Sequence, residues 1–178
     1  MTDTPLTPAP GQSDFGRGGR MLLLVTKNAA IAGGLVFVGL VVMSLASIVG
    51  RKLFALPVPG DVEVLQMCAA FASSAFFAYC HLVGGDVKVD FFTHSLAPAK
   101  VALLDALGSL LVGLFGTLIA WRTAAGALAV HEVGETSAVL AWPMWIAQAL
   151  MVPGFVMLAA AGLYMAWLRL HAVLRGAP

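Results

Sequence analysis

Four long stretches of the chain carry almost only apolar residues, and shorter polar or charged segments separate them. In the first stretch no charged residue occurs between Lys27 and Arg51. Its 23 residues, 28–50, make about 34 Å of helix at 1.5 Å per residue, enough to cross a hydrocarbon core of about 30 Å. Further spans are expected at about 64–83, 99–122 and 143–168. The pattern therefore predicts an all-α membrane protein with four transmembrane helices in an antiparallel bundle.

The segments that flank these spans are more polar. Residues 1–26 are rich in Pro and Gly and predict a polar, mobile N-terminal segment, 27–170 the membrane domain, and 171–178 a tail. A cleaved signal peptide is the alternative interpretation of the first span, but signal-peptide apolar regions are usually about 7–15 residues long. Pro153 falls inside the fourth span and predicts a kink or a lost backbone hydrogen bond there.

The positive residues predict the orientation of the spans. If the N-terminus is cytoplasmic, that side holds seven Lys or Arg residues and the opposite side holds three. Because Lys and Arg concentrate on the cytoplasmic side of membrane proteins, both termini are expected in the cytoplasm. The seven are Arg17, Arg20, Lys27, Lys88, Lys100, Arg169 and Arg175, and the three are Arg51, Lys52 and Arg122.

The composition narrows the classes of protein to consider. Hydrophobic residues make up 60% of the chain and charged residues 11%, against roughly 45–50% and about 25% in soluble domains. This excess makes a soluble enzyme domain improbable and excludes a disordered chain. The formal net charge is +1 without any basic tract, so the lipid bilayer is an expected partner and nucleic acid is not.

A four-helix membrane electron carrier is one alternative. Haem-binding bundles need histidines that face each other within helices, whereas three of the four histidines fall in predicted loops or tails and His81 lies near a helix end. Cys68 and Cys80 are separated by about 18 Å on one helix, too far for a disulfide. We therefore expect no cofactor in this chain and no enzymatic activity.

An independent small transporter is the second alternative. Carriers usually place ionisable residues inside the membrane, where they mark the path of an ion or substrate. No Asp, Glu, Lys or Arg lies near the centre of a predicted span. Small residues four positions apart, Gly116 with Ala120 and Gly162 with Ala166, are instead typical of helices that pack closely in lipid. Transport by this chain alone is not favoured.

The distinctive polar residues lie at the ends of the spans. Asp61 and Glu63 open the second span, where acidic residues suit the helix dipole, and pairing of either one with Arg51 across the turn is also open. The link that follows this span alternates apolar and charged residues. We expect contacts with another subunit from Arg51, Glu63, Asp86, Lys88, Asp90 and Glu135, with Trp142 and Trp145 setting the depth in the membrane.

Three motifs occur in an order that resembles one transporter family. They are Gly50-Arg51 followed by PGDVE at 59–63, GGDVKVD at 84–90, and GETSAVLAWPMW at 134–145. Together with the four-span layout, the chain resembles the small membrane subunit (DctQ type) of tripartite ATP-independent periplasmic (TRAP) transporters. The resemblance covers roughly 27–170.

The resemblance implies a function that the composition does not. It implies a non-catalytic permease subunit of the bacterial inner membrane, a fixed scaffold beside a large membrane subunit of DctM type. That large subunit would hold the substrate and sodium sites. A periplasmic solute-binding protein of DctP type would deliver an organic acid for sodium-coupled uptake.

Overall fold

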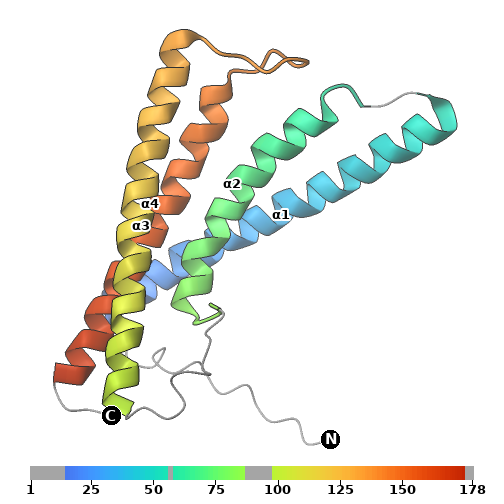
Figure 1. Cartoon of the computed structure of the whole chain (residues 1–178). Coiled ribbons are helices and arrows are strands. Elements are labelled where there is room, and N and C mark those ends of the chain that lie inside the picture. Colours follow the sequence, from blue (N-terminus) through green and yellow to red (C-terminus); the bar gives the residue numbers. More distant parts are fainter. Residues whose placement is uncertain (1–14, 56–57, 87–97, 175–178) are drawn as a thin grey trace, which may run out of the picture.

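The computed structural model of the protein describes residues 15–55, 58–86 and 98–174. Within these ranges the chain forms four helices, each long and apolar enough to cross a membrane. They are α1 (Arg17–Phe54), α2 (Asp61–Leu82), α3 (Pro98–Val133) and α4 (Met144–Leu174). Figure 1 shows successive helices running in opposite directions. The predicted all-α membrane fold is therefore confirmed.

All four helices extend beyond the predicted spans, and α2 does so only by residues 61–63 at its start. α1 begins at Arg17, so 17–26 are helical where a polar segment was expected, and α3 continues to Val133 rather than 122. α4 continues to Leu174 and runs through Pro153 without a break. Hydropathy indicates only the apolar part of a helix, whereas the backbone hydrogen bonds of the helix continue until a residue with a non-helical conformation ends them. At the end of α3 that residue is Gly134, whose φ of 68° suits glycine.

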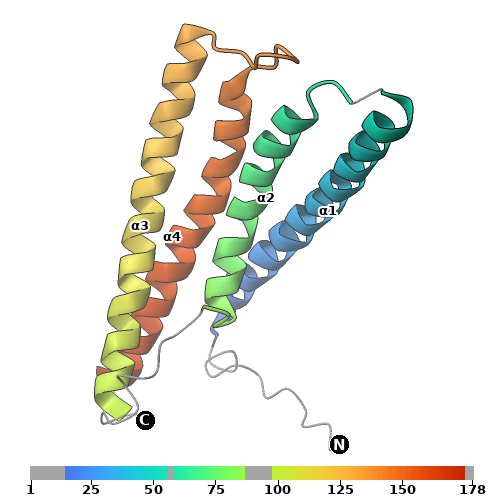
Figure 2. The same cartoon turned by 45° about the vertical axis from the view of Figure 1, so that its right-hand side comes forward.

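The helices pack as an open row in the order α1–α2–α4–α3. Among the described residues, α3 contacts no helix but α4, and α1 reaches α4 through few residues. Figures 1 and 2 show α1 and α2 leaning away from α3 and α4 toward one end of the molecule. We call this end, which carries the α1–α2 and α3–α4 connections, the loop end, and the opposite end the terminal end.

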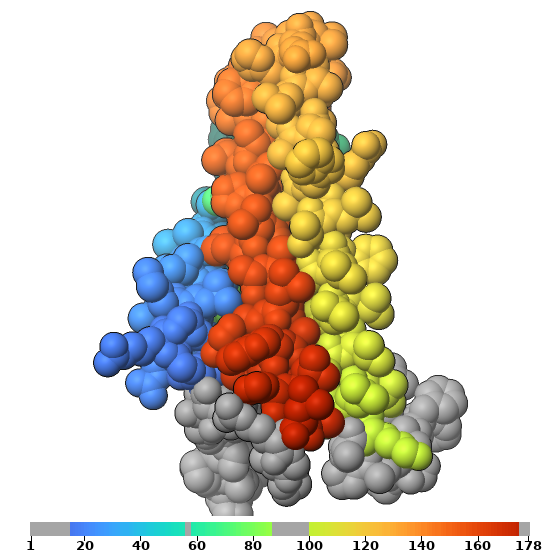
Figure 3. Space-filling view, turned by 90° about the vertical axis from the view of Figure 1, so that its left-hand side faces the viewer, coloured from blue at the N-terminus to red at the C-terminus, as the bar shows by residue number. Residues whose placement is uncertain are grey.

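The α3–α4 contact is the most extensive in the row, and glycines bring the two backbones close together. A Cβ atom on Gly162 of α4 would lie 2.4 Å from the backbone nitrogen of Gly113 on α3. A Cβ on Gly116 would lie 2.8 Å from the backbone nitrogen of Ala159. Figure 3 shows the two helices side by side along their length. The expected role of Gly116 and Gly162 in close packing is confirmed.

A polar contact joins the same two helices near the terminal end. Nη1 of Arg169 on α4 donates to Oγ of Ser109 at 2.6 Å and to the backbone oxygen of Asp105 at 3.0 Å, both on α3. Ser109 is buried and donates in turn to the Asp105 carbonyl. The cation thereby ties the last turns of α4 to the first turns of α3.

A small apolar core lies near the terminal end, where α1, α2 and α4 meet. It consists of Phe15, Ala78, Leu82, Ala161 and Met165. Elsewhere many large apolar side chains are exposed, above all along α1. In a bilayer such residues contact lipid tails or another subunit, so their exposure accords with a membrane protein.

Candidate functional site

The α1–α2 connection is held by a carboxylate with three donors. Oδ2 of Asp61, at the start of α2, accepts from Ser47 Oγ at 2.5 Å and from Arg51 Nη2 at 3.3 Å. Its Oδ1 accepts from the backbone N–H of Val62 at 2.9 Å. Of the two acids that the sequence offered as partners for Arg51, the structure selects Asp61. The ion pair closes the α1–α2 hairpin at the loop end.

Glu63 joins α2 to the loop between α3 and α4. Its Oε1 accepts from the backbone N–H of Val139 at 2.7 Å, and its Oε2 accepts from that of Leu140 at 3.0 Å. The Leu140 side chain also lies against Gly60, where a Cβ would be only 2.5 Å from Leu140 Cγ. Gly60 has a φ of 71°, a conformation that glycine adopts without strain. The Glu63 carboxylate therefore makes a tertiary contact as well as lying in the first turn of α2.

The loop that Glu63 holds has a hairpin-like structure of its own. Thr136 and Pro143 form an antiparallel bridge, and the backbone N–H of Ser137 donates to the Trp142 carbonyl at 2.8 Å. The buried Ser137 hydroxyl accepts from the Trp142 N–H at 3.2 Å. The backbone N–H of Met144 donates to the Glu135 carbonyl at 3.1 Å. The segment predicted as a family motif is thus an ordered hairpin loop, 134–143.

The predicted residues of this loop lie near one another. Trp142 is half exposed at the start of α4, and Trp145 packs edge-on against His131 of α3 with ring centroids 5.0 Å apart. Glu135 is exposed. Together with Glu63 they surround the loop end of α4, whereas Arg51 lies at the other side of α2 with α1. The candidate residues at the loop end therefore form two groups, one on each side of α2.

At the terminal end, Asp86 pairs with a buried histidine. Asp86 Oδ2 lies 2.5 Å from Nδ1 of His81, whose side chain is 5% exposed. Within the described part of the chain, Nε2 of His81 has no hydrogen-bond partner. Lys88 and Asp90, the other two residues expected here, lie outside the described residues. Asp86 thus pairs with a buried side chain of the last turn of α2 from just beyond the end of that helix.

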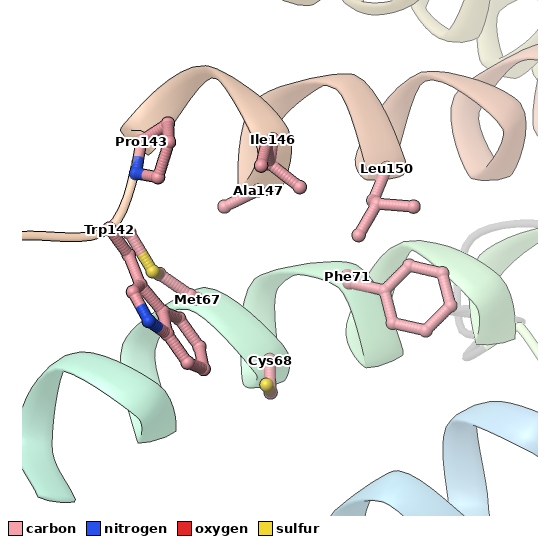
Figure 4. Close-up of a pocket in the computed structure, with 8 residues that line it drawn as sticks. All are labelled: Met67, Cys68, Phe71, Trp142, Pro143, Ile146, Ala147 and Leu150. Atoms are coloured by element: carbon pink, nitrogen blue, oxygen red, sulfur yellow. The ribbon is translucent and has the colours of Figure 1, made fainter. Parts of the chain in front are cut away.

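An apolar groove lies between α2 and α4 below the hairpin loop. It has a volume of about 390 Å³. Figure 4 shows α2 side chains on one wall, α4 side chains on the other, and Trp142 at the loop end. The lining residues are Met67, Cys68, Phe71, Trp142, Pro143, Ile146, Ala147 and Leu150. The lining carries no charge, so the groove offers an apolar surface at the depth of the membrane.

A second groove of about 480 Å³ shares two lining residues, Met67 and Ala147, with the first. Polar side chains enter its lining, because Glu63, Gln66 and Gln148 border it together with the hairpin loop. In the described ranges, no group of three or more His, Cys, Asp or Glu side chains has the arrangement of a metal site.

The comparison with known families decides between the interpretations. The family model of the DctQ component of tripartite ATP-independent periplasmic transporters matches residues 40–172, about three quarters of the chain. The chain belongs to the DctQ family. No curated protein and no solved structure matched it.

Membership of the DctQ family confirms the resemblance drawn from the three motifs. The matched residues extend from the middle of α1 to the last turn of α4, so they include both connections at the loop end. The chain is therefore a multi-pass membrane protein and the small subunit of a TRAP transporter, a system with partner subunits.

Three residues that make polar contacts in this structure were not predicted as contacts from the sequence. Ser47 lies four residues before Arg51 and so on the same helix face, a spacing that could have indicated it. Ser137 is buried inside the hairpin loop, and Arg169 reaches across to α3. No local pattern marks these two, because their partners are distant in the sequence.

Proposed function

We propose that this DctQ-family chain is a fixed, non-catalytic scaffold of its transporter. It packs in the bacterial inner membrane, with both termini cytoplasmic, beside a large subunit of DctM type. The large subunit holds the substrate and sodium sites and moves during transport. A binding protein of DctP type delivers an organic acid on the periplasmic side, which is the loop end of this chain.

The main support for this proposal is that a polar side-chain contact joins each neighbouring pair of helices in the row. Asp61 with Arg51 ties α1 to α2, Glu63 ties α2 to the loop that opens α4, and Arg169 ties α4 to α3. The glycine contacts add a close backbone approach between α3 and α4. Hinge or shear motion needs elements that slide or pivot on one another. Contacts between all neighbouring helices favour a chain that stays rigid while its partner subunit moves.

The distribution of charge supports the same function. The charged residues of the described helices lie toward their ends, and the central turns are apolar. Ionisable groups within the membrane usually mark a transport path. The exposed apolar side chains of α1, including Leu35 and Val38, form a broad surface for lipid or a subunit.

Distance measurements between the outer helices test the scaffold directly. Leu53 on α1 and Val133 on α3 are 70% and 81% exposed, and both lie at the loop end. We expect spin labels on Leu53→Cys and Val133→Cys, in a chain with Cys68→Ser and Cys80→Ser, to give one unchanged distance. The assembled transporter is measured with and without sodium, acid and binding protein.

Uptake gives the complementary test. Vesicles that contain the large subunit should accumulate labelled acid, with the binding protein outside, only when this chain is present. A label distance that shifts between the transport states would contradict a fixed scaffold. Full uptake by the large subunit and binding protein without this chain would contradict any structural role in transport.

A further inference from the structure

A third groove lies between α1 and α2 at the loop end, where the two helices separate. Its volume is about 420 Å³, within the range of about 300–1,000 Å³ that is typical of ligand pockets. Ile48, Val62 and Leu65 form apolar walls, and all three side chains are exposed to the surroundings. Arg51, Lys52 and Asp61 also line it. The groove therefore combines an apolar slot with charged groups.

The charged groups leave a positive charge at the groove. Both oxygens of Asp61 already have donors, since Oδ2 accepts from Ser47 and Arg51 and Oδ1 accepts from the Val62 N–H. The Arg51 side chain uses Nη2 for Asp61 and is still 61% exposed. Lys52 forms no hydrogen bond or ion pair with any described residue. Two cations and one satisfied carboxylate thus line the groove.

The position along α1 places these cations at the membrane surface. The uncharged run from Lys27 to Arg51 is about as long as the hydrocarbon core is thick. Ile48 and Ser44 lie about one and two turns deeper along α1 than Arg51 and line the same groove. From the surface inward, the groove therefore presents cations first and apolar side chains next.

We propose that the α1–α2 groove binds an anionic glycerophospholipid, with the phosphate on Arg51 and Lys52 and one acyl chain between Ile48 and Leu65. The order of groups in the groove matches the order of groups in such a lipid. Basic residues between membrane helices are a recognised way to bind anionic headgroups.

The charge balance selects an anionic headgroup. A zwitterionic lipid brings its own ammonium group, and the carboxylate nearest to it, Asp61, already has its donors. Lys52 lies at the end of the molecule where the orientation rule disfavours positive residues, and it has no acidic partner there among the described residues. A lipid phosphate supplies that partner. The uncharged groove beside Trp142, by contrast, has nothing that selects a headgroup (Figure 4).

Lipid titration of the full-length chain in detergent, followed by native mass spectrometry, tests the proposal. The probes are phosphatidylglycerol, phosphatidylethanolamine with the same acyl chains, and glycerol phosphate. We expect the chain to bind phosphatidylglycerol more tightly than phosphatidylethanolamine. Lys52→Gln should weaken phosphatidylglycerol binding about fivefold, the contribution expected of one cation at an anionic lipid surface.

Two further variants separate the slot from the charge. Arg122→Gln removes an exposed cation from α3, outside the groove, and should leave the affinity unchanged. Ser44→Phe fills the slot and keeps both cations, so it should weaken binding of both lipids. Lys52→Gln changes an exposed side chain and leaves the fold intact, so its result stands even if Ser44→Phe does not fold.

Several outcomes would overturn the proposal. Equal affinity for the two lipids, or no effect of Lys52→Gln, would remove the headgroup site. Glycerol phosphate that binds as tightly as the lipid would make this a site for a free anion. Loss of the bound lipid when the large subunit is added would make the groove a protein contact. Retention of phosphatidylglycerol in the two-subunit complex supports the lipid site.

Discussion

The close contact between α3 and α4 predicts a large effect from a single methyl group. In Gly162→Ala the new Cβ would lie 2.4 Å from the Gly113 nitrogen, 2.6 Å from the Gly113 Cα and 2.9 Å from the Ser109 carbonyl oxygen. All three are backbone atoms, so no side chain can rotate away. Ordinary contact begins near 3.4 Å, so the helices must separate by about 1 Å at this point.

The expected loss of stability in Gly162→Ala is the difference between two opposing free-energy contributions. Overpacking of this kind costs about 1–3 kcal/mol. Replacing a helical glycine by alanine returns about 0.5–1 kcal/mol of backbone entropy. The net loss should lower the Tm by several degrees, at about 2–4 °C per kcal/mol for a chain of this size. Thermal unfolding of the purified chain in detergent, followed by tryptophan fluorescence, measures it.

Gly108→Ala is the matched control on α3. A Cβ at Gly108 meets nothing within 4 Å, so this variant keeps the entropy gain without the clash and should leave the Tm unchanged or slightly raised. Gly113→Ala, whose Cβ would lie 2.8 Å from the Leu163 nitrogen, should fall between the two. A Gly162→Ala variant as stable as Gly108→Ala would refute the inference that backbone contact sets the α3–α4 distance.

Two further predictions concern the loop end. The side chain of Glu63→Gln offers one carbonyl oxygen to two N–H donors, so hydrogen exchange at the Val139 and Leu140 amides should become faster. Glu135→Gln is the control and should leave both exchange rates unchanged. Equal effects of the two variants would show that the Glu63 contact does not hold the loop. The second prediction tests the cytoplasmic position of both termini in a chain with Cys68→Ser and Cys80→Ser. A membrane-impermeant maleimide should label Val133→Cys in intact cells and Leu174→Cys only after permeabilisation. The reverse pattern of labelling would contradict cytoplasmic termini.

The sequence predicted the helices well, because long uncharged runs are a direct consequence of crossing lipid. It did not predict the order α1–α2–α4–α3. In a soluble bundle an apolar stripe shows which face turns inward, but lipid tails are as apolar as the core, so the sides of each helix look alike. The glycines on α3 and α4 predicted close helix packing but did not indicate which two helices are in contact.

The polar contacts likewise include one that the sequence predicted and one that it did not. Arg51 and the acids of the next turn are close in sequence, so their pairing was expected, and only the choice of Asp61 needed the structure. Glu63 lies 76 residues from Val139 and bonds to its backbone N–H, a group that every non-proline residue has. No side-chain pattern marks such a partner. Contacts of this kind become visible only when the fold brings the two segments together.

The open row of helices bears on the scaffold that we propose for this small subunit. A closed four-helix bundle turns one side of every helix inward, whereas in this row α1 and α3 each have one main neighbour and α2 and α4 have two. More side surface therefore remains on each helix for lipid and for a partner subunit. In a row of this kind each neighbouring pair of helices depends mainly on its own contacts, because among the described residues few contacts join helices that are not neighbours. Asp61 and Glu63 provide ties at the loop end, and Arg169 provides one at the terminal end. This distribution of contacts accords with the fixed scaffold that we propose.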